Sequence, residues 1–270
     1  MTALRYVYAV CRPLTAPLQA ELRGVAGAPA RQLEHHGFIA VVSQVPDSDF
    51  SEEALRTRLE DMDWLTATAR AHQNVIDALT GVTTPLPLRM ATVFRDDSAV
   101  RVMMEKREDA FRHALDRLDG RVEWGVKIFM ENADGEGGGD GGEDTGARTG
   151  SAAPKAMSGR DYLRQRRMRT TAREEQWRQV EEFARRLHES LSAQAEDSRL
   201  HAPQNPQLSG AAGRNVLNAA YLVPRARSEE FVTLVDRTKD DTPGIRVELT
   251  GPWAAYSFTG LAEESAGEPT

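Results

Sequence analysis

The sequence predicts an α+β fold of two small domains, the N-terminal one ferredoxin-like and the second carrying a long helix. Short apolar strands and amphipathic helices follow one another in both halves of the chain, which indicates packed layers of helix and sheet. A stretch dominated by glycine and acidic residues separates the halves. We therefore expect an N-terminal domain at residues 1–130, a flexible linker at 131–155, a second domain at 156–260 and a disordered tail at 261–270.

Strands of the N-terminal domain are predicted from their residue types. Leu4–Cys11 is rich in β-branched and aromatic residues, and Ala30–Glu34 is a shorter candidate. Phe38–Val45 is nearly continuous in apolar residues, as expected for a strand covered on both faces. Two prolines hold the start of Leu86–Phe94 extended. Glu123–Phe129 alternates in polarity, and we expect it to be shared with, or adjacent to, the second domain.

Helical segments lie between these strands. Ser51 is expected to cap a helix whose apolar residues recur every three or four positions as far as Leu79, with a break near residues 61–63. A second amphipathic segment runs from Ser98 to Leu118. The resulting order of strands and helices approaches a ferredoxin-like α+β sandwich.

The flexible linker is predicted from the amino-acid composition of residues 131–155. Glycine and acidic residues cannot bury enough apolar surface to offset the entropy of ordering the chain. A glycine-rich loop can also cradle phosphate, but a phosphate-binding P-loop ends in a Lys-Ser or Lys-Thr pair that this stretch lacks. Its carboxylates would repel phosphate as well. We therefore expect a flexible acidic connection.

The second domain is predicted to start with the long helix, Ala156–Asp197, either continuous or broken. A strand at Asn215–Val223, a helix at Glu229–Lys239 and a strand at Ile245–Leu249 follow. These elements form a second small α+β unit.

The beginning of the long helix is strongly basic, and three interpretations are open. It is a solvated face whose arginines pair with glutamates along the helix, a docking surface for an acidic partner or for the linker, or a nucleic-acid surface. The acidic charge of the whole chain disfavours nucleic acid. The candidate partner-interface residues of this stretch are Tyr162, Arg164, Arg166, Arg167 and Arg169.

Composition limits the remaining classes. A net charge of −7 argues against a dedicated nucleic-acid binder. The single cysteine, Cys11, cannot form an internal disulfide, which favours a reducing compartment. Arg5 interrupts the first apolar stretch, so we expect no export signal, and no segment approaches the roughly 20 apolar residues of a membrane span. We expect a cytoplasmic protein with no membrane partner.

We assign no catalytic, cofactor-binding or metal-binding residue from the sequence. His35 and His36 are adjacent, so their side chains would point to different faces of an extended strand, and we expect no metal there. His72 is expected to be a partly buried histidine that bonds a local backbone group. Arg89 and Glu123 are expected to pair across neighbouring strands. None of these patterns indicates an enzyme.

Several stretches carry a family resemblance. Residues 86–94 read LPLRMATVF, residues 123–127 read EWGVK, residues 218–223 read NAAYLV and residues 247–258 read VELTGPWAAYSF. These motifs resemble, in the same order, those of the gas vesicle protein L/F family, and the likeness covers nearly the whole chain except the glycine-rich stretch. In the first motif Met90 and Ala91 replace the family's usual Phe-Gly pair.

The resemblance implies a non-enzymatic gas vesicle assembly factor or minor vesicle component. Such a protein would be cytoplasmic and associated with gas vesicles. It would bind the vesicle wall protein, which is small and very apolar, or other accessory vesicle proteins. An adaptor of this kind can hold its partner through a sheet edge or an apolar patch. Besides the basic stretch, the candidate interface residues are Trp253, Tyr256 and Phe258.

Two alternatives remain. A small-ligand-binding or enzymatic tandem ferredoxin-like protein would need a pocket with convergent polar groups, expected near His72, Arg89 and Glu123. RNA binding through the arginine-rich helix would give an affinity that falls steeply with salt.

Overall fold

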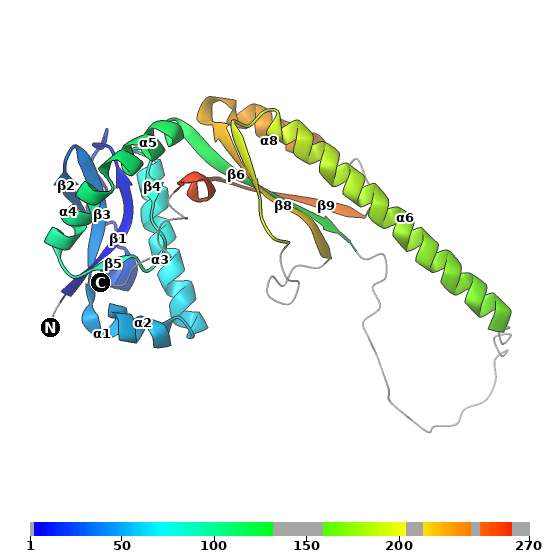
Figure 1. Cartoon of the computed structure of the whole chain (residues 1–270), viewed down its shortest axis with the longest axis horizontal. Helices are drawn as coiled ribbons and strands as arrows, with labels where there is room; N and C mark the ends of the chain where they lie inside the picture. The colour runs from blue at the N-terminus through cyan, green and yellow to red at the C-terminus, as the bar shows by residue number, and fades with distance from the viewer. Residues whose placement is uncertain (1–2, 132–158, 204–212, 239–243, 261–270) are drawn as a thin grey trace, which may run out of the picture.

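The computed structural model describes residues 3–131, 159–203, 213–238 and 244–260. It consists of two halves, each built on an antiparallel sheet (Figure 1). From residue 132 onward the predicted linker lies outside the described residues, as does the predicted tail.

The N-terminal sheet has five strands. Its order is β2-β3-β1-β4, and β5 also pairs with β1. Every pairing is antiparallel. The strands are β1 (Ala3–Cys11), β2 (Arg31–His35), β3 (Phe38–Pro46), β4 (Leu86–Pro87) and β5 (Val93–Phe94).

The predicted strand at Leu86–Phe94 is wrong as a single strand. It forms β4 and β5, separated by a turn in which Ala91 has a φ of 62°. Alternating polarity identified an extended segment, but nothing in the pattern marked a residue in the left-handed region. Both short strands still pair with β1.

Helices cover both faces of this sheet. On one face α3 (Met62–Thr80) packs with the short α1 (Asp47–Phe50), and on the other face lie α4 (Asp97–Lys106) and α5 (Glu108–Leu118) (Figure 1). The remaining N-terminal helices are η1 (Val25–Gly27) and α2 (Glu52–Arg58). Strand β3 is therefore covered on both faces, as predicted.

The predicted helix signals have local causes. The Ser51 side chain accepts a hydrogen bond from the Ala54 amide at the start of α2. Asp61 caps α3 through the amides of Asp63 and Trp64, which confirms the break expected near residues 61–63. The segment expected from Ser98 to Leu118 is interrupted once, at Arg107.

The C-terminal sheet has the order β7-β8-β6-β9. One of its faces is covered by α6, a continuous helix over Gly159–Ser192, and by α8 (Figure 1). The alternating residues Val122, Trp124, Val126 and Ile128 point into this core. The other elements of this half are β6 (Arg121–Met130), β7 (Asp197–Leu200), β8 (Arg214–Pro224), η2 (Arg225–Arg227), α8 (Ser228–Thr238), β9 (Ile245–Trp253) and η3 (Tyr256–Phe258).

The α+β class is confirmed in its general form, as helices packed on two antiparallel sheets; the ferredoxin-like arrangement stays a prediction. Strand β6 pairs with β8 and β9, so it belongs to the second sheet even though the sequence-based division at residue 130 placed it in the first domain. The edge strand β7 was not predicted, because its sequence Asp-Ser-Arg-Leu carries no apolar alternation. None of the helices in the described residues has the length and hydrophobicity of a membrane span.

Candidate functional site

The helix η3 lies where the two halves meet (Figure 1). Phe258 is fully buried in the core beneath α4 and α5, together with Val100 and Phe111. Leu222 of β8 belongs to the same cluster, so this core runs from one half into the other. The structure corrects the expectation that Phe258 contacts a partner: its side chain joins the two halves of this chain.

A histidine bridges the same junction. His72 of α3 lies between two tyrosines: its Nδ1 is 2.9 Å from the Tyr6 hydroxyl, and its Nε2 is 3.0 Å from the Tyr256 hydroxyl. The Tyr6 hydroxyl accepts a hydrogen bond from the Ala91 amide at 3.1 Å, so its own proton is available for Nδ1. We therefore assign the neutral tautomer in which Nε2–H donates to Tyr256.

Burial lowers the pKa of His72 to about 4, because the protonated ring would lose its hydration. The histidine is neutral near pH 7 and joins the halves through hydrogen bonds. Its buried, structural setting agrees with the sequence-based interpretation, but its partners are tyrosine hydroxyls instead of local backbone groups.

The Glu123 carboxylate lies close by. It accepts hydrogen bonds from the Ser257 amide at 2.8 Å and from the Ser257 hydroxyl at 2.7 Å. Burial raises the pKa of this carboxyl group, while the bonds from Ser257 oppose the shift. The expected pairing with Arg89 across neighbouring strands is wrong, because Arg89 follows β4 in the other sheet.

Ser257 also lies 3.3 Å from the Nε2 atom of His201. A serine, a histidine and a carboxylate therefore lie together, but Glu123 accepts hydrogen bonds from the serine and does not orient the histidine. A nucleophilic triad needs the acid on the far nitrogen of the histidine. This cluster lacks that order, and its contacts fasten η3 to β6.

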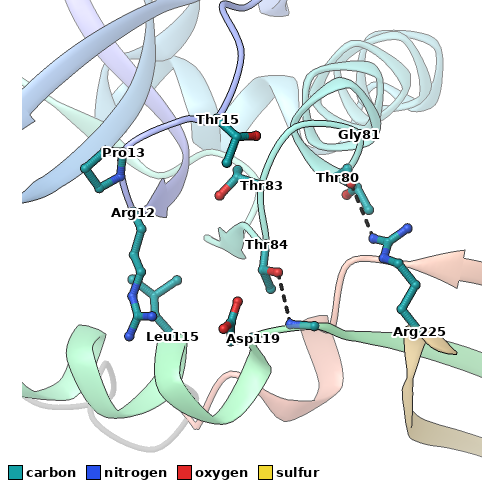
Figure 2. A pocket seen from close by; sticks show the side chains of 11 residues that line it. Arg12, Pro13, Thr15, Thr80, Gly81, Thr83, Thr84, Leu115, Asp119 and Arg225 are labelled. Atoms are coloured by element: carbon teal, nitrogen blue, oxygen red, sulfur yellow. Dashed lines mark hydrogen bonds between the residues drawn. The ribbon is translucent and has the colours of Figure 1, made fainter.

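An open hollow of about 480 Å³ lies at the seam between the halves (Figure 2). Within it the Gly120 amide donates to the Thr84 hydroxyl at 3.4 Å, and Arg225 donates to the Thr80 carbonyl at 3.3 Å. Arg12 forms an ion pair with Asp116. Both arginines at the hollow thus already have protein partners. The hollow does not include the residues that the ligand-binding alternative named.

The basic stretch lies at the start of α6, which runs on past the strands of its sheet (Figure 1). We name residues 159–173 the α6 arm; it contains six arginines and one aspartate. Arg164, Arg166 and Arg167 are exposed there, and Met168 among them is 66% exposed. Tyr162 and Arg169 belong to the same helix, but their side chains lie outside the described part of the structure.

If the arm is a solvated face, its arginines should pair with glutamates along α6. The described pairs join Glu175 to Arg178, Glu182 to Arg185 and Arg186, and Glu189 to Arg185. These glutamates therefore pair with arginines further along the helix than the α6 arm. Both the solvated face and the docking surface stay predictions for the arm.

The other interface candidates, Trp253, Tyr256 and Phe258, do not lie at the α6 arm. Trp253 ends β9 and is 40% exposed, whereas Tyr256 is half-buried against His72. Figure 1 shows the far end of α6 projecting away from η3. Sequence reasoning missed the role of η3 inside the molecule, since a run of aromatic residues looks the same at an internal junction and at an external interface.

Known proteins resemble this chain over nearly its full length. Gas vesicle protein L of Streptomyces sp. (strain CB03234) is 52% identical over 98% of this chain and 96% of its own. Gas vesicle protein F of the same strain is 28% identical over 94% of this chain and 98% of its own. Gas vesicle protein F1 of Halobacterium salinarum is 23% identical over 99% of each chain.

Two crystal structures share the fold. GvpF from Microcystis aeruginosa gives a TM-score of 0.60 at 18% identity and covers 96% of this chain and 99% of its own. GvpF from Anabaena sp. PCC7120 gives 0.62 at 15% identity, with 95% and 96% covered. The model of the family described as gas vesicle synthesis protein GvpL/GvpF matches residues 4–260. With this match and the 52% identity, the chain belongs to the GvpL/GvpF family of gas vesicle synthesis proteins.

Proposed function

We propose that this chain is a non-enzymatic gas vesicle assembly factor of the L subtype, which works in the cytoplasm on growing gas vesicles. Membership of the family supports the assembly role. The subtype is supported by the higher identity with the L protein than with the F protein of one strain, 52% against 28%. The chain acts as an adaptor that binds the wall protein or another accessory vesicle protein.

The observation that carries the adaptor role is the α6 arm. A helix that projects beyond its own sheet presents side chains that the other described residues do not cover. Exposed arginines next to an exposed Met168 offer charge and apolar contact together, which suits a partner with an acidic and apolar surface. Arginine and methionine are also enriched at protein interfaces relative to other surfaces.

Strand β9 offers a second point of attachment. It is the outermost strand of the β7-β8-β6-β9 sheet, and Trp253 at its end is 40% exposed. An edge strand presents backbone groups to which another chain can add by hydrogen bonding. Tyr256 and Phe258 are excluded from this surface, because they hold the junction.

The test is co-purification of the tagged chain from cells that express a complete gas vesicle gene cluster. The variant Arg164→Glu/Arg166→Glu/Arg167→Glu reverses the charge of the α6 arm. The matched control, Arg56→Glu/Arg70→Glu/Arg95→Glu, makes the same charge change at exposed arginines of the N-terminal half. We expect wild type and control to recover vesicle proteins and the arm variant to lose them, with fewer vesicles per cell.

Each contrary result has a distinct meaning. Equal recovery by the arm variant and the control would remove the α6 arm as the docking surface, and Trp253→Ala would then test β9. Recovery of nucleic acid in place of protein, with salt-sensitive affinity, would favour the RNA alternative. If wild type recovered no protein of the cluster, the adaptor role itself would fail.

A further inference from the structure

Two histidines and a glutamate converge at one end of the N-terminal sheet. His35 ends β2, His36 lies in the turn between β2 and β3, and Glu105 belongs to the last turn of α4. One ligand-type atom from each of the three lies within 4.8 Å of the others. The two imidazole rings are 4.3 Å apart, centre to centre. The sequence-based expectation that they point to different faces is wrong.

The tight turn explains the convergence. Because His35 pairs with Phe38, only His36 and Gly37 form the loop of the β2–β3 hairpin. Both have positive φ values, 49° and 79°, as two-residue hairpin turns of the primed type require. The alternation of an extended strand stops at His36, so its ring comes to the same side as the ring of His35.

The distances suit a metal ion. The Nε2 atoms of His35 and His36 lie 3.4 and 3.5 Å from the same oxygen, Oε1 of Glu105. Nitrogen and oxygen ligands bind zinc at about 2.0–2.2 Å, and tetrahedral geometry then separates neighbouring ligand atoms by roughly 3.4 Å. The Nε2 atom of His35 is also shielded from solvent and has no hydrogen-bond partner among the described residues. An ion between these atoms would satisfy it.

A second carboxylate orients one of the histidines. Nδ1 of His36 lies 3.0 Å from Oε2 of Glu108, which follows Glu105 across the break between α4 and α5. Glu108 is itself fixed by Arg112 at 2.5 Å. A carboxylate on Nδ1 places the histidine proton there and leaves Nε2 as the ligand atom, the usual arrangement around protein-bound zinc.

We propose that His35, His36 and Glu105 bind a divalent transition-metal ion of the zinc type, with Glu108 as a positioning residue for His36. Two imidazoles and one carboxylate favour zinc over calcium or magnesium, which prefer all-oxygen sites. Three protein ligands leave a fourth position for water. An adjoining open hollow of about 380 Å³, lined in part by both histidines, provides room for it. The ion would link the β2–β3 turn to α4.

The test uses the full chain, purified without a polyhistidine tag and titrated with zinc chloride by calorimetry at pH 7.5. We expect one zinc per chain, a rise in melting temperature with zinc, and no binding of calcium. Glu105→Gln should lose more than tenfold in affinity, and Glu108→Gln between about 10- and 100-fold. His36→Asn should abolish binding, because asparagine tolerates a positive φ but the imidazole ligand is gone.

Control variants and melting temperatures separate loss of the metal site from a change in the fold. His113 is an exposed histidine of α5 outside the cluster, so His113→Gln should bind zinc like wild type. Glu105 is exposed, and its replacement by glutamine should leave the fold intact in the absence of metal. Zinc should raise the melting temperature of wild type and His113→Gln but not of Glu105→Gln. The proposal is overturned if wild type shows no saturable binding, or if Glu105→Gln and His36→Asn bind as tightly as wild type.

Discussion

Replacing His72 should change how the stability of this protein depends on pH. Histidine in an unfolded chain has a pKa near 6.5, whereas burial lowers the pKa of His72 to about 4. Between these pH values the unfolded chain binds more protons than the folded chain, so the free energy of unfolding rises with pH. This contribution is complete above pH 6.5 and is lost as the pH falls toward 4. It amounts to about 3 kcal/mol, at up to roughly 1.4 kcal/mol per pH unit.

The assay is guanidinium unfolding followed by tryptophan fluorescence between pH 5 and 7.5. Glu123, whose pKa is raised by burial, acts with the opposite sign, so wild type alone does not isolate His72. The informative quantity is the slope of unfolding free energy against pH in His72→Gln relative to wild type. We expect a flatter slope in His72→Gln than in wild type. A slope in His72→Gln equal to that of wild type would refute the assignment of a neutral, buried imidazole.

Three further substitutions test the junction and the β4–β5 turn. Phe258→Ala should cost about 3–5 kcal/mol and split the unfolding transition in two, because it empties the core shared by both halves; fluorescence and circular dichroism would then give different midpoints. Tyr256→Phe should cost about 1–3 kcal/mol in urea unfolding, since it leaves the Nε2–H group of His72 without an acceptor. Ala91→Gly should stabilise the protein by about 0.5–1 kcal/mol and raise its melting temperature, because glycine adopts a φ of 62° without strain. A lower melting temperature would contradict this.

Polarity patterns predicted elements more reliably than the links between them. The long strand β3, the helix α3 and the long α6 follow from the polarity pattern, and Ser51 caps α2 as predicted. The division of Leu86–Phe94 into β4 and β5 depends on the conformation of a single residue, Ala91. The family motif offered a signal there, because Ala91 stands where the family usually has glycine, and a φ of 62° explains that preference.

The histidine pair shows a different limit. Adjacent residues point apart only if both are in an extended strand, and the hairpin turn ends that alternation between His35 and His36. The third residue, Glu105, comes from α4, far along the chain, so no local spacing could have announced it. A His-His-Gly sequence after a short strand does carry a turn signal, in the glycine that a positive φ favours. Taking that signal into account would have placed both rings on one side.

The family motif at Trp253–Phe258 has a structural role inside the molecule. The sequence alone suggests that its aromatic residues form a docking surface. In the structure Phe258 fills a core, Tyr256 hydrogen-bonds His72 and Ser257 hydrogen-bonds Glu123. Ser257 holds η3 to β6 of its own half, while Phe258 and Tyr256 reach the N-terminal half, so the motif fixes the two halves against each other. A segment engaged in this way cannot release its side chains to a partner without opening the junction. For this reason the docking surface that we propose lies on the α6 arm and the edge strand β9, which these contacts do not involve.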